Sequence, residues 1–297
     1  MAQFDIFTDA TSDLTVEQEK QWGLGIVPLG VTVKGKSFMH YPDERELTMK
    51  EFYSALRAGL DVQSSATPPS FFSEAIEKSL KAGRDALVIV ISSKLSCGFQ
   101  NAEIAAEDLR EEYPQRRIVI VDSLGASCGL GLLVKMAADW RDEGRDILDT
   151  AAHVEAAKGH VCQVFTVDSL KHLRRGGRIS AAAAIAGSVL SVKPIMNVDP
   201  SGKLIPLGTV RGRKKAIAEL AARMKKLAID PEEQHVFISQ ADCEEDAELL
   251  ASIIRETVGA KEITINQIGP VVATHGGCGS LALFFIGKYR ESMMPGR

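Results

Sequence analysis

The segment Gly269 to Ser280, GPVVATHGGCGS, combines the side chains and the backbone freedom of an anion-binding site. A short apolar run ends in Thr274 and His275, and three of the next four residues are glycines. Glycine tolerates positive φ and leaves its N–H exposed, which suits the binding of an anion. A hydroxyl and an imidazole beside such a loop can hold a carboxylate or a phosphate. The alternative is a glycine-rich turn between a strand and a helix, in which His275 makes a structural hydrogen bond.

Three other segments are rich in hydroxyl groups and lie at the ends of expected strands or before expected helices. Their sequences are TDATSD from Thr8, SSATPPS from Ser64 and SSKLSCGFQ from Ser92. Ligands bind at the carboxyl ends of strands in open α/β sheets, and helix N-termini offer free N–H groups to anions. Helix capping and Asx turns explain each segment taken singly. Several such loops on one kind of sheet edge indicate a shared polar pocket.

The sequence GASCG around Ser127 matches the G-x-S-x-G pattern of the nucleophile elbow in α/β-hydrolases. The elbow requires the serine on the turn directly after a strand. Here the expected strand ends near Val121, and Ser127 falls in the first turn of a helix. We therefore interpret the small residues as allowing a helix to pack closely on a sheet.

Two basic clusters stand out, KHLRRGGR ending at Arg178 and RGRKK beginning at Arg211. Most of these side chains are expected to be solvated. Arg178 follows two glycines and is the best candidate for a directed role. Guanidinium groups suit an acidic partner or a phosphate. No interleaved aromatic residues support binding to nucleic acid.

The composition excludes several other classes of protein. The 297 residues carry a net charge of −4, which disfavours a nucleic-acid binder that acts through its whole surface. No apolar run approaches the ~20 residues of a membrane span, and the N-terminus lacks a signal-peptide pattern. The five cysteines are scattered without C-x-x-C, so we expect reduced thiols, a cytoplasmic protein and no metal site. No motif for a cofactor is present.

Short apolar runs alternate with helical patterns along the chain, which predicts an α/β fold with substantially parallel sheets. The expected strands are Phe4–Phe7, Ile26–Val33, Ala86–Ile91, Ile118–Val121, Val161–Phe165, Pro194–Val198, Leu204–Val210, Val236–Ser239, Glu262–Asn266 and Val271–Ala273. The expected helices are Thr48–Arg57, Phe71–Lys81, Asn101–Glu112, Ser127–Glu143, Ile147–Lys158, Arg213–Ala228, Cys243–Val258 and the segment after Gly279.

The second half of the chain is expected to be more mixed than the first. Lys193 to Gly208 contains a DPSG turn between apolar runs, which predicts a β-hairpin. Ala181 to Gly187 is expected to form a close-packed helix or turn. A boundary is predicted near Gly159, with one lobe over residues 1–159 and another over residues 160–297.

Seven segments, in order and over essentially the whole chain, resemble the DegV family, which includes the fatty-acid-binding subunits of bacterial fatty acid kinase. They are FTDATSDL, SSATPPSFF, ISSKLSCGFQNA, VDSLGASCGLGLLV, DSLKHLRRGGRIS, VKPIMNVDPSGKL and GPVVATHGGCGS. The resemblance implies two α/β lobes, the first with a mainly parallel sheet and the second with a mixed sheet. Together they would form one domain over about residues 3–288 that encloses a long-chain fatty acid.

The same resemblance implies the roles of particular residues. The fatty-acid carboxylate would contact Ser65, Ser96, Thr274 and His275. Arg178 and Arg211 would dock a partner or face a phosphate, the partner being a separate ATP-dependent kinase subunit that forms the acyl phosphate. On this view the chain is a carrier with no catalytic group, metal or cofactor of its own.

The sequence departs from the family pattern at four places. These differences affect which hydrogen bonds can hold the carboxylate and how wide the pocket is. Cys97-Gly98 replaces Gly-Thr, Thr67 replaces Gln, Cys278 stands where proline is common, and Ser65 takes a position often held by Thr.

Two other functions remain open from the residues themselves. One is a serine hydrolase or esterase acting on acyl substrates, with Ser127 or Ser96 as nucleophile and His275 as base. The weaker one is a nucleic-acid-associated regulator that uses the basic clusters, whose binding would depend on salt.

Overall fold

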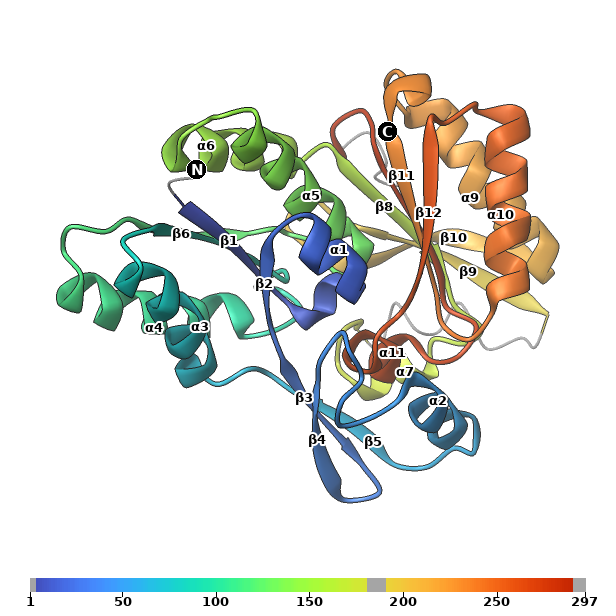
Figure 1. The fold of residues 1–297 in the computed structure, drawn as a ribbon. Helices are drawn as coiled ribbons and strands as arrows, with labels where there is room; N and C mark the ends of the chain where they lie inside the picture. Colours follow the sequence, from blue (N-terminus) through green and yellow to red (C-terminus); the bar gives the residue numbers. More distant parts are fainter. Residues whose placement is uncertain (1–3, 181–190, 291–297) are drawn as a thin grey trace.

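A computed structural model describes residues 4–180 and 191–290, which form three β-sheets and the helices that cover them. In the orientation of Figure 1, one sheet lies on the left, a second on the right and a small third sheet at the bottom. No helix in the described ranges is both long enough and apolar enough to cross a membrane.

The first sheet is parallel throughout and has the strand order β2-β1-β6-β7. Its strands are β1 (Phe4–Asp9), β2 (Leu24–Val27), β6 (Asp85–Val90) and β7 (Ile118–Asp122). Helices cover both faces, which explains why β6 is apolar from Ala86 onward. The helices of this part are α1 (Val16–Gln21), α3 (Pro69–Lys81), α4 (Gly98–Glu112), α5 (Cys128–Asp142) and α6 (Ile147–Ala157), with the short helix η1 (Ala10–Ser12) after β1.

The second sheet is mixed and has the order β10-β9-β8-β13-β11-β12. Its strands are β8 (Val161–Thr166), β9 (Val192–Val198), β10 (Leu204–Arg211), β11 (His235–Gln240), β12 (Glu262–Gln267) and β13 (Leu281–Ile286). Only the β11–β12 pair is parallel among these described strands. The outer face is covered by α9 (Arg213–Leu227) and α10 (Glu244–Thr257), and η3 (Pro231–Glu233) precedes β11. The predicted fold class, with a parallel first sheet and a mixed second sheet, is confirmed.

Helix α5 packs against both large sheets. Its apolar residues share one core with Phe4 and Ile6 of the first sheet and with Phe237 and Phe284 of the second. Figure 1 shows α5 between the two sheets. The predicted lobes therefore contact each other through a buried core, while the boundary near Gly159 stays a prediction.

The third sheet was not predicted. It is antiparallel, with the order β4-β3-β5, and consists of β3 (Leu29–Val33), β4 (Lys36–His40) and β5 (Val62–Ser65). The single strand expected over Ile26–Val33 is in fact β2 and β3, which belong to different sheets. Pro28 separates them, because proline supplies no N–H to a strand ladder. Helix α2 (Met49–Arg57) packs beside this sheet.

Two elements near the C-terminus contradict the sequence prediction. Val271–Ala273, expected as a strand, lies in helix α11 (Pro270–Gly276), which begins with proline at its first position. The segment after Gly279, expected as a helix, is strand β13 in the middle of the second sheet. A short apolar run does not by itself distinguish a strand from a buried helix.

The basic cluster that ends at Arg178 contains helix α7 (Lys171–Arg175), which packs against α11. The hairpin expected over Lys193 to Gly208 is confirmed as β9 and β10, with a bulge between Pro206 and Gly208. The prediction for Ala181 to Gly187 lies outside the described residues.

Candidate functional site

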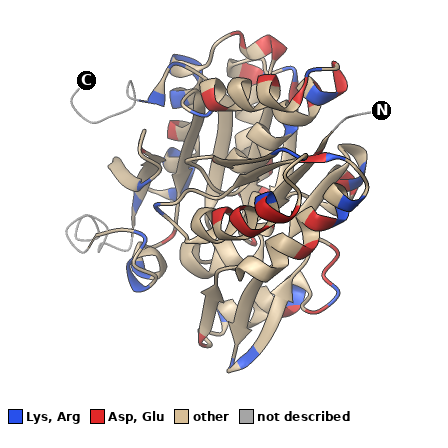
Figure 2. Cartoon of the chain, turned by 90° about the vertical axis from the view of Figure 1, so that its left-hand side faces the viewer, with Lys and Arg blue, Asp and Glu red and all other residues tan. Residues whose placement is uncertain are grey.

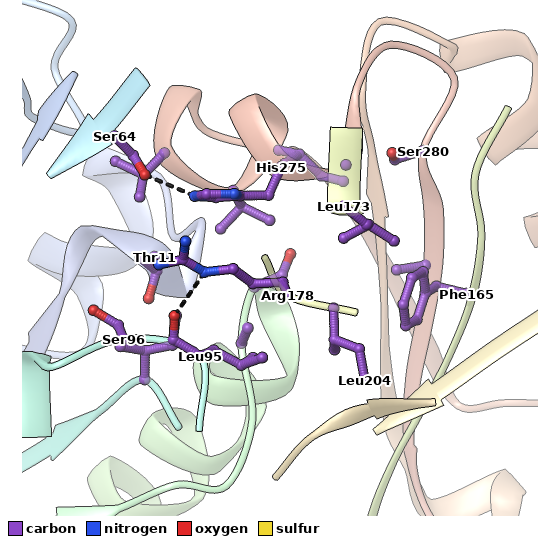
Figure 3. Close-up of a pocket in the computed structure, with 18 of the residues that line it drawn as sticks. Thr11, Ser64, Leu95, Ser96, Phe165, Leu173, Arg178, Leu204, His275 and Ser280 are labelled. Atoms are coloured by element: carbon purple, nitrogen blue, oxygen red, sulfur yellow. Dashed lines mark hydrogen bonds between the residues drawn. The ribbon is translucent and has the colours of Figure 1, made fainter. Parts of the chain in front are cut away.

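Segments that follow strands of the first sheet, strands of the other two sheets and helices α7 and α11 line a cavity of about 260 Å³. Its wall is mostly apolar, and Ser64, Ser96, Arg178 and His275 lie on one side of it, whereas Ser280 lies on the side of Phe165 (Figure 3). The lining residues are Thr11, Leu29, Ser64, Ser65, Ala66, Ile91, Leu95, Ser96, Cys97, Ala126, Ser127, Gln163, Phe165, Val167, Leu173, Arg178, Val198, Leu204, Ile268, Val271, Val272, His275, Gly276, Ser280, Leu281, Ala282 and Phe284.

We call the part of the wall around Ser64, Ser96, Arg178 and His275 the polar end. Figure 3 shows these side chains on one side, with Phe165 and Leu204 on the other. A mostly apolar cavity with a cation, hydroxyls and an imidazole together at one end fits an elongated amphiphile with a polar head.

His275, near the end of α11, is hydrogen-bonded to Ser64 on β5, with 2.7 Å between its Nε2 and the serine Oγ. Burial, together with the nearby cations Arg178 and Arg175, lowers the pKa of His275 to about 4. The ring is therefore neutral at neutral pH and has one donor and one acceptor nitrogen. Gly176 makes room for this ring, because a Cβ there would lie 2.2 Å from the Nδ1 atom of His275.

Arg178 supplies a positive charge at the polar end. Its Nε donates to the carbonyl of Leu95 at 3.0 Å, and its Nη1 donates to the carbonyl of Gly176 at 2.5 Å. These bonds hold a half-buried guanidinium on the cavity wall beside His275. Arg178 was predicted to face a partner or a phosphate, and its side chain lies on the wall of the cavity.

Of the four residues predicted to contact a carboxylate, Ser65, Ser96 and His275 line the cavity. The Ser96 hydroxyl lies in the loop before α4, where it accepts from Gly98 N at 3.3 Å. Thr274 is buried outside the lining, and its hydroxyl donates to the carbonyl of Pro270 at 2.7 Å. The structure therefore does not bring Thr274 to the wall with the others. The contacts with a carboxylate stay predictions.

The residues that depart from the family pattern differ in how deeply they are buried. Cys97 lines the cavity and is exposed at the start of α4. Thr67 is buried, and its hydroxyl donates to the carbonyl of Pro28 at 2.6 Å, so it joins two loops of the first half. Cys278 packs against the core of the third sheet.

Ser127 lies 5% exposed on the cavity wall and is bonded to a buried carboxyl group rather than to His275. Its hydroxyl donates to Asp13 and lies 3.0 Å from Ser239 Oγ. Burial raises the pKa of Asp13 to about 8, and this carboxyl also accepts from Gly269 N at 2.9 Å. Strand β7 ends at Asp122, so Ser127 is not on the turn directly after it. A serine hydrolase needs a nucleophilic serine that is hydrogen-bonded to a histidine. The hydroxyl bonded to His275 is that of Ser64, so neither Ser127 nor Ser96 forms this pair.

The glycines around Ser127 allow close packing, as predicted. A Cβ at Gly129 would lie 2.6 Å from Gln163 Oε1 and 2.9 Å from Phe284, and one at Gly125 would lie 2.4 Å from Gln163 Nε2. The start of α5 thus rests directly on β8 and β13.

Arg211 lies exposed at the end of β10. On the face shown in Figure 2, Lys and Arg are interspersed with Asp and Glu rather than collected in one basic surface. Across residues 4–180 and 191–290, no group of three or more His, Cys, Asp or Glu side chains is arranged to hold a metal ion.

Ser64 and Thr11 line the cavity, and the sequence analysis placed them in hydroxyl-rich segments without naming them as site residues. Ser64 and Ser65 are neighbours on β5, and successive strand residues point to opposite faces. The pairing with His275 spans 211 residues along the chain, and no local pattern signals it.

The sequence and structure comparisons with known proteins agree on one family. The DegV family model matches residues 3–288. A DegV domain-containing protein of Clostridium perfringens is 41% identical over 291 residues, covering 98% of this chain and all of the relative. A Thermus thermophilus structure, described as fatty acid binding of a DegV family protein, has a TM-score of 0.86 at 28% identity and covers 96% of this chain and 99% of its own. The structure of DegV from Bacillus subtilis, described as a fatty acid binding protein, has a TM-score of 0.82 at 26% identity and covers 97% of this chain and all of its own.

Proposed function

Because the chain belongs to the DegV family, we propose that it binds one long-chain fatty acid in the cavity, with the carboxylate at the polar end. The observation that carries the proposal is the Arg178 guanidinium beside the His275–Ser64 pair at one end of a mostly apolar cavity. The relatives from Thermus thermophilus and Bacillus subtilis, described as fatty-acid-binding, support it.

The binding energetics of a fatty acid fit a wall that is mostly apolar and has polar groups at one end. Each buried CH₂ group contributes about 0.8 kcal/mol, so a long acyl chain can supply most of the affinity. A buried carboxylate needs donors, because leaving it unpaired costs several kcal/mol. Arg178, Ser64 and Ser96 supply such donors without a metal ion, and the neutral His275 orients the hydroxyl of Ser64.

We further propose that the protein presents the carboxylate to a separate kinase subunit and does not itself catalyse acyl-phosphate formation. Arg178 reaches the cavity, while the exposed Arg211 lies away from its lining and suits contact with the partner. The five free cysteines fit a reducing cytoplasm as the place of this reaction.

Mass spectrometry of lipid extracted from the purified protein tests the binding proposal. We expect one fatty acid per chain, or stoichiometric uptake of added fatty acid after delipidation. A protein that is empty as purified and takes up no added fatty acid would contradict it. Adding a cognate kinase and ATP then tests presentation, with acyl phosphate expected only when both proteins are present.

The hydrolase alternative keeps one specific observation in its favour. Ser127 has φ of 55° and ψ of −149°, a strained conformation for a residue other than glycine, and its hydroxyl is bonded to a buried carboxyl group. A fluorophosphonate probe decides between the two functions. Covalent labelling of Ser127 would support the hydrolase, whereas an unlabelled protein that retains fatty acid supports the carrier.

A further inference from the structure

The turn that joins β9 to β10, residues 199–203, is fastened to loops of the first sheet. Ser92, in the loop after β6, donates its hydroxyl proton to the carbonyl of Gly202 at 2.9 Å. Ser92 is fully buried, and a Cβ at Gly202 would lie 2.2 Å from its Oγ and 3.2 Å from the Cα of Leu124. The turn therefore packs tightly against the loops that follow β6 and β7.

A buried arginine holds the same turn from a second side. The side chain of Arg290 is fully buried, and its Nη1 donates to the carbonyl of Leu124 at 2.8 Å and to that of Asp199 at 3.4 Å. One guanidinium thus bridges the loop after β7 and the turn between β9 and β10. We call the Ser92–Gly202 bond and the Arg290 bridge the latch.

The latched turn lies between two residues of the cavity wall. Val198 precedes the turn and Leu204 follows it, the two are paired across the hairpin, and both line the cavity. Figure 3 shows Leu204 on the side of Phe165, away from the polar end. Lys203, directly before Leu204, is exposed, so the chain passes from solvent to cavity wall within one residue. Residues 198–204, which we call the hairpin tip, therefore cover the apolar part of the cavity.

The hairpin tip is built to move as a unit against the rest of the second sheet. Within β9 the pairing with β8 runs up to Asn197, immediately before the tip. In β10 the bulge between Pro206 and Gly208 interrupts the ladder shortly after the tip. The turn keeps its own shape, since Asp199 Oδ1 accepts from Ser201 N at 2.8 Å. Hinges are commonly a few residues of this kind at the ends of elements.

We propose that the hairpin tip is a lid held shut by the latch, and that its release lets the acyl chain enter and leave the cavity. This inference rests on the proposed fatty-acid binding and adds the route of exchange. Ser92, Gly202 and Arg290 lie outside the cavity lining, so the latch does not contact the ligand. Because the acid passes the lid in both directions, a weaker latch raises the rates of association and dissociation by the same factor and leaves the dissociation constant unchanged.

The first test locks the lid with a disulfide. A Cβ at Gly202 would lie 3.2 Å from the Cβ of Ser92, close to the separation of about 3.5–4.5 Å in natural disulfides. The double variant Ser92→Cys/Gly202→Cys is loaded with radiolabelled octadecanoic acid and then oxidised with glutathione disulfide, and the cross-link is verified by mass spectrometry. Release into excess unlabelled acid should slow by at least about tenfold and recover with dithiothreitol. The two single-cysteine variants, treated alike, should keep fast release.

The second test weakens the latch without a cross-link. Ser92→Ala removes the hydroxyl that holds Gly202, so both exchange rates should rise by the same factor, roughly two- to tenfold, the range for one neutral hydrogen bond. The dissociation constant should stay at the wild-type value. The matched control is Ser201→Ala, because the Ser201 hydroxyl donates to Asp199 Oδ1 at 2.7 Å inside the turn. Its rates should equal those of the wild type.

The outcomes separate this inference from the function on which it rests. If the delipidated wild-type protein binds no fatty acid, the proposed function fails, and the lid fails with it. If the acid binds and the cross-linked protein releases it as fast as the reduced protein, only the lid is wrong. Should the double variant not fold or not cross-link, Ser92→Ala decides alone. Unchanged rates in that variant, or a changed dissociation constant with unequal rate changes, would overturn the lid.

Discussion

The polar end of the cavity and the wall along β8 are assembled from the chain in different ways. At the polar end, Ser64 pairs with His275 across 211 residues, and Arg178 bonds to Leu95 across 83. Along β8, Gln163, Phe165 and Val167 are alternate residues of one continuous segment.

This difference implies different responses to change. The β8 wall is set by strand alternation, so we expect it to tolerate substitutions that keep Phe165 and Val167 apolar. The polar end depends on four segments meeting, so substituting one of its polar side chains should change how the carboxylate is held.

The largest effect is expected when a charge enters the apolar wall. Leu204→Glu on β10 places a carboxylate on the lining, where it meets the acyl tail. Burying an unpaired charge is costly, so fatty-acid affinity should fall by at least about 100-fold. Isothermal titration with delipidated protein measures this. Thr209→Glu, exposed on the same strand, is the control and should bind normally. Normal binding by Leu204→Glu would place the ligand elsewhere.

Next in size is the loss of the cation at the polar end. Arg178→Ala should weaken fatty-acid binding by about 1.5–3 kcal/mol, the range for a hydrogen bond to a charged group. Arg178→Lys should recover part of this, because ammonium keeps the charge but lacks the fork of the guanidinium.

Arg211→Ala is the matched control for Arg178→Ala. It should bind fatty acid normally and melt at the wild-type temperature, yet support less acyl-phosphate formation with a cognate kinase. Equal losses of binding in the two alanine variants would remove the distinction between an arginine on the cavity wall and one facing the partner.

A smaller effect is expected for the hydroxyl that orients His275. Ser64→Ala removes one neutral hydrogen bond and should weaken binding by about 0.5–1.5 kcal/mol. In a double-mutant cycle with His275→Ala, the two losses should not add, because the side chains act as a pair. Ser65→Ala tests the neighbouring assignment. A larger effect from Ser65 than from Ser64 would make Ser65 the residue that meets the carboxylate.

The smallest effect on the ligand is expected from Asp13, which acts on stability instead. Burial raises its pKa to about 8, while an unfolded aspartate titrates near 3.9. The folded state therefore holds a proton that the unfolded state lacks between these values, and stability should fall as pH rises through this window.

Asp13→Asn should remove that contribution, since an amide accepts from Gly269 N without titrating. Urea unfolding at about pH 6 and about pH 8 measures the change in each protein. A wild-type loss of stability no larger than that of the variant would show that Asp13 is ionised in the folded state.

Several local features could be predicted from the sequence because neighbouring residues decide them. The continuous apolar run of β6 predicted a strand covered on both faces, and the DPSG turn predicted the hairpin of β9 and β10. Thr48 predicted the start of α2, where its hydroxyl accepts from Glu51 N in a capping box. Local patterns failed for α11 and β13, where a short apolar run has the same appearance whether it pairs with strands or packs as a helix.

The sequence by itself determined the α/β class, the hydroxyl-rich loops and the family. Each depends on residue types within a few positions of one another. Only the tertiary structure decided that Ser64 rather than Ser127 bonds to His275 and that Arg178 lies on the cavity wall. These facts depend on which distant segments share a surface, since a hydrogen bond forms only when donor and acceptor come within about 3 Å.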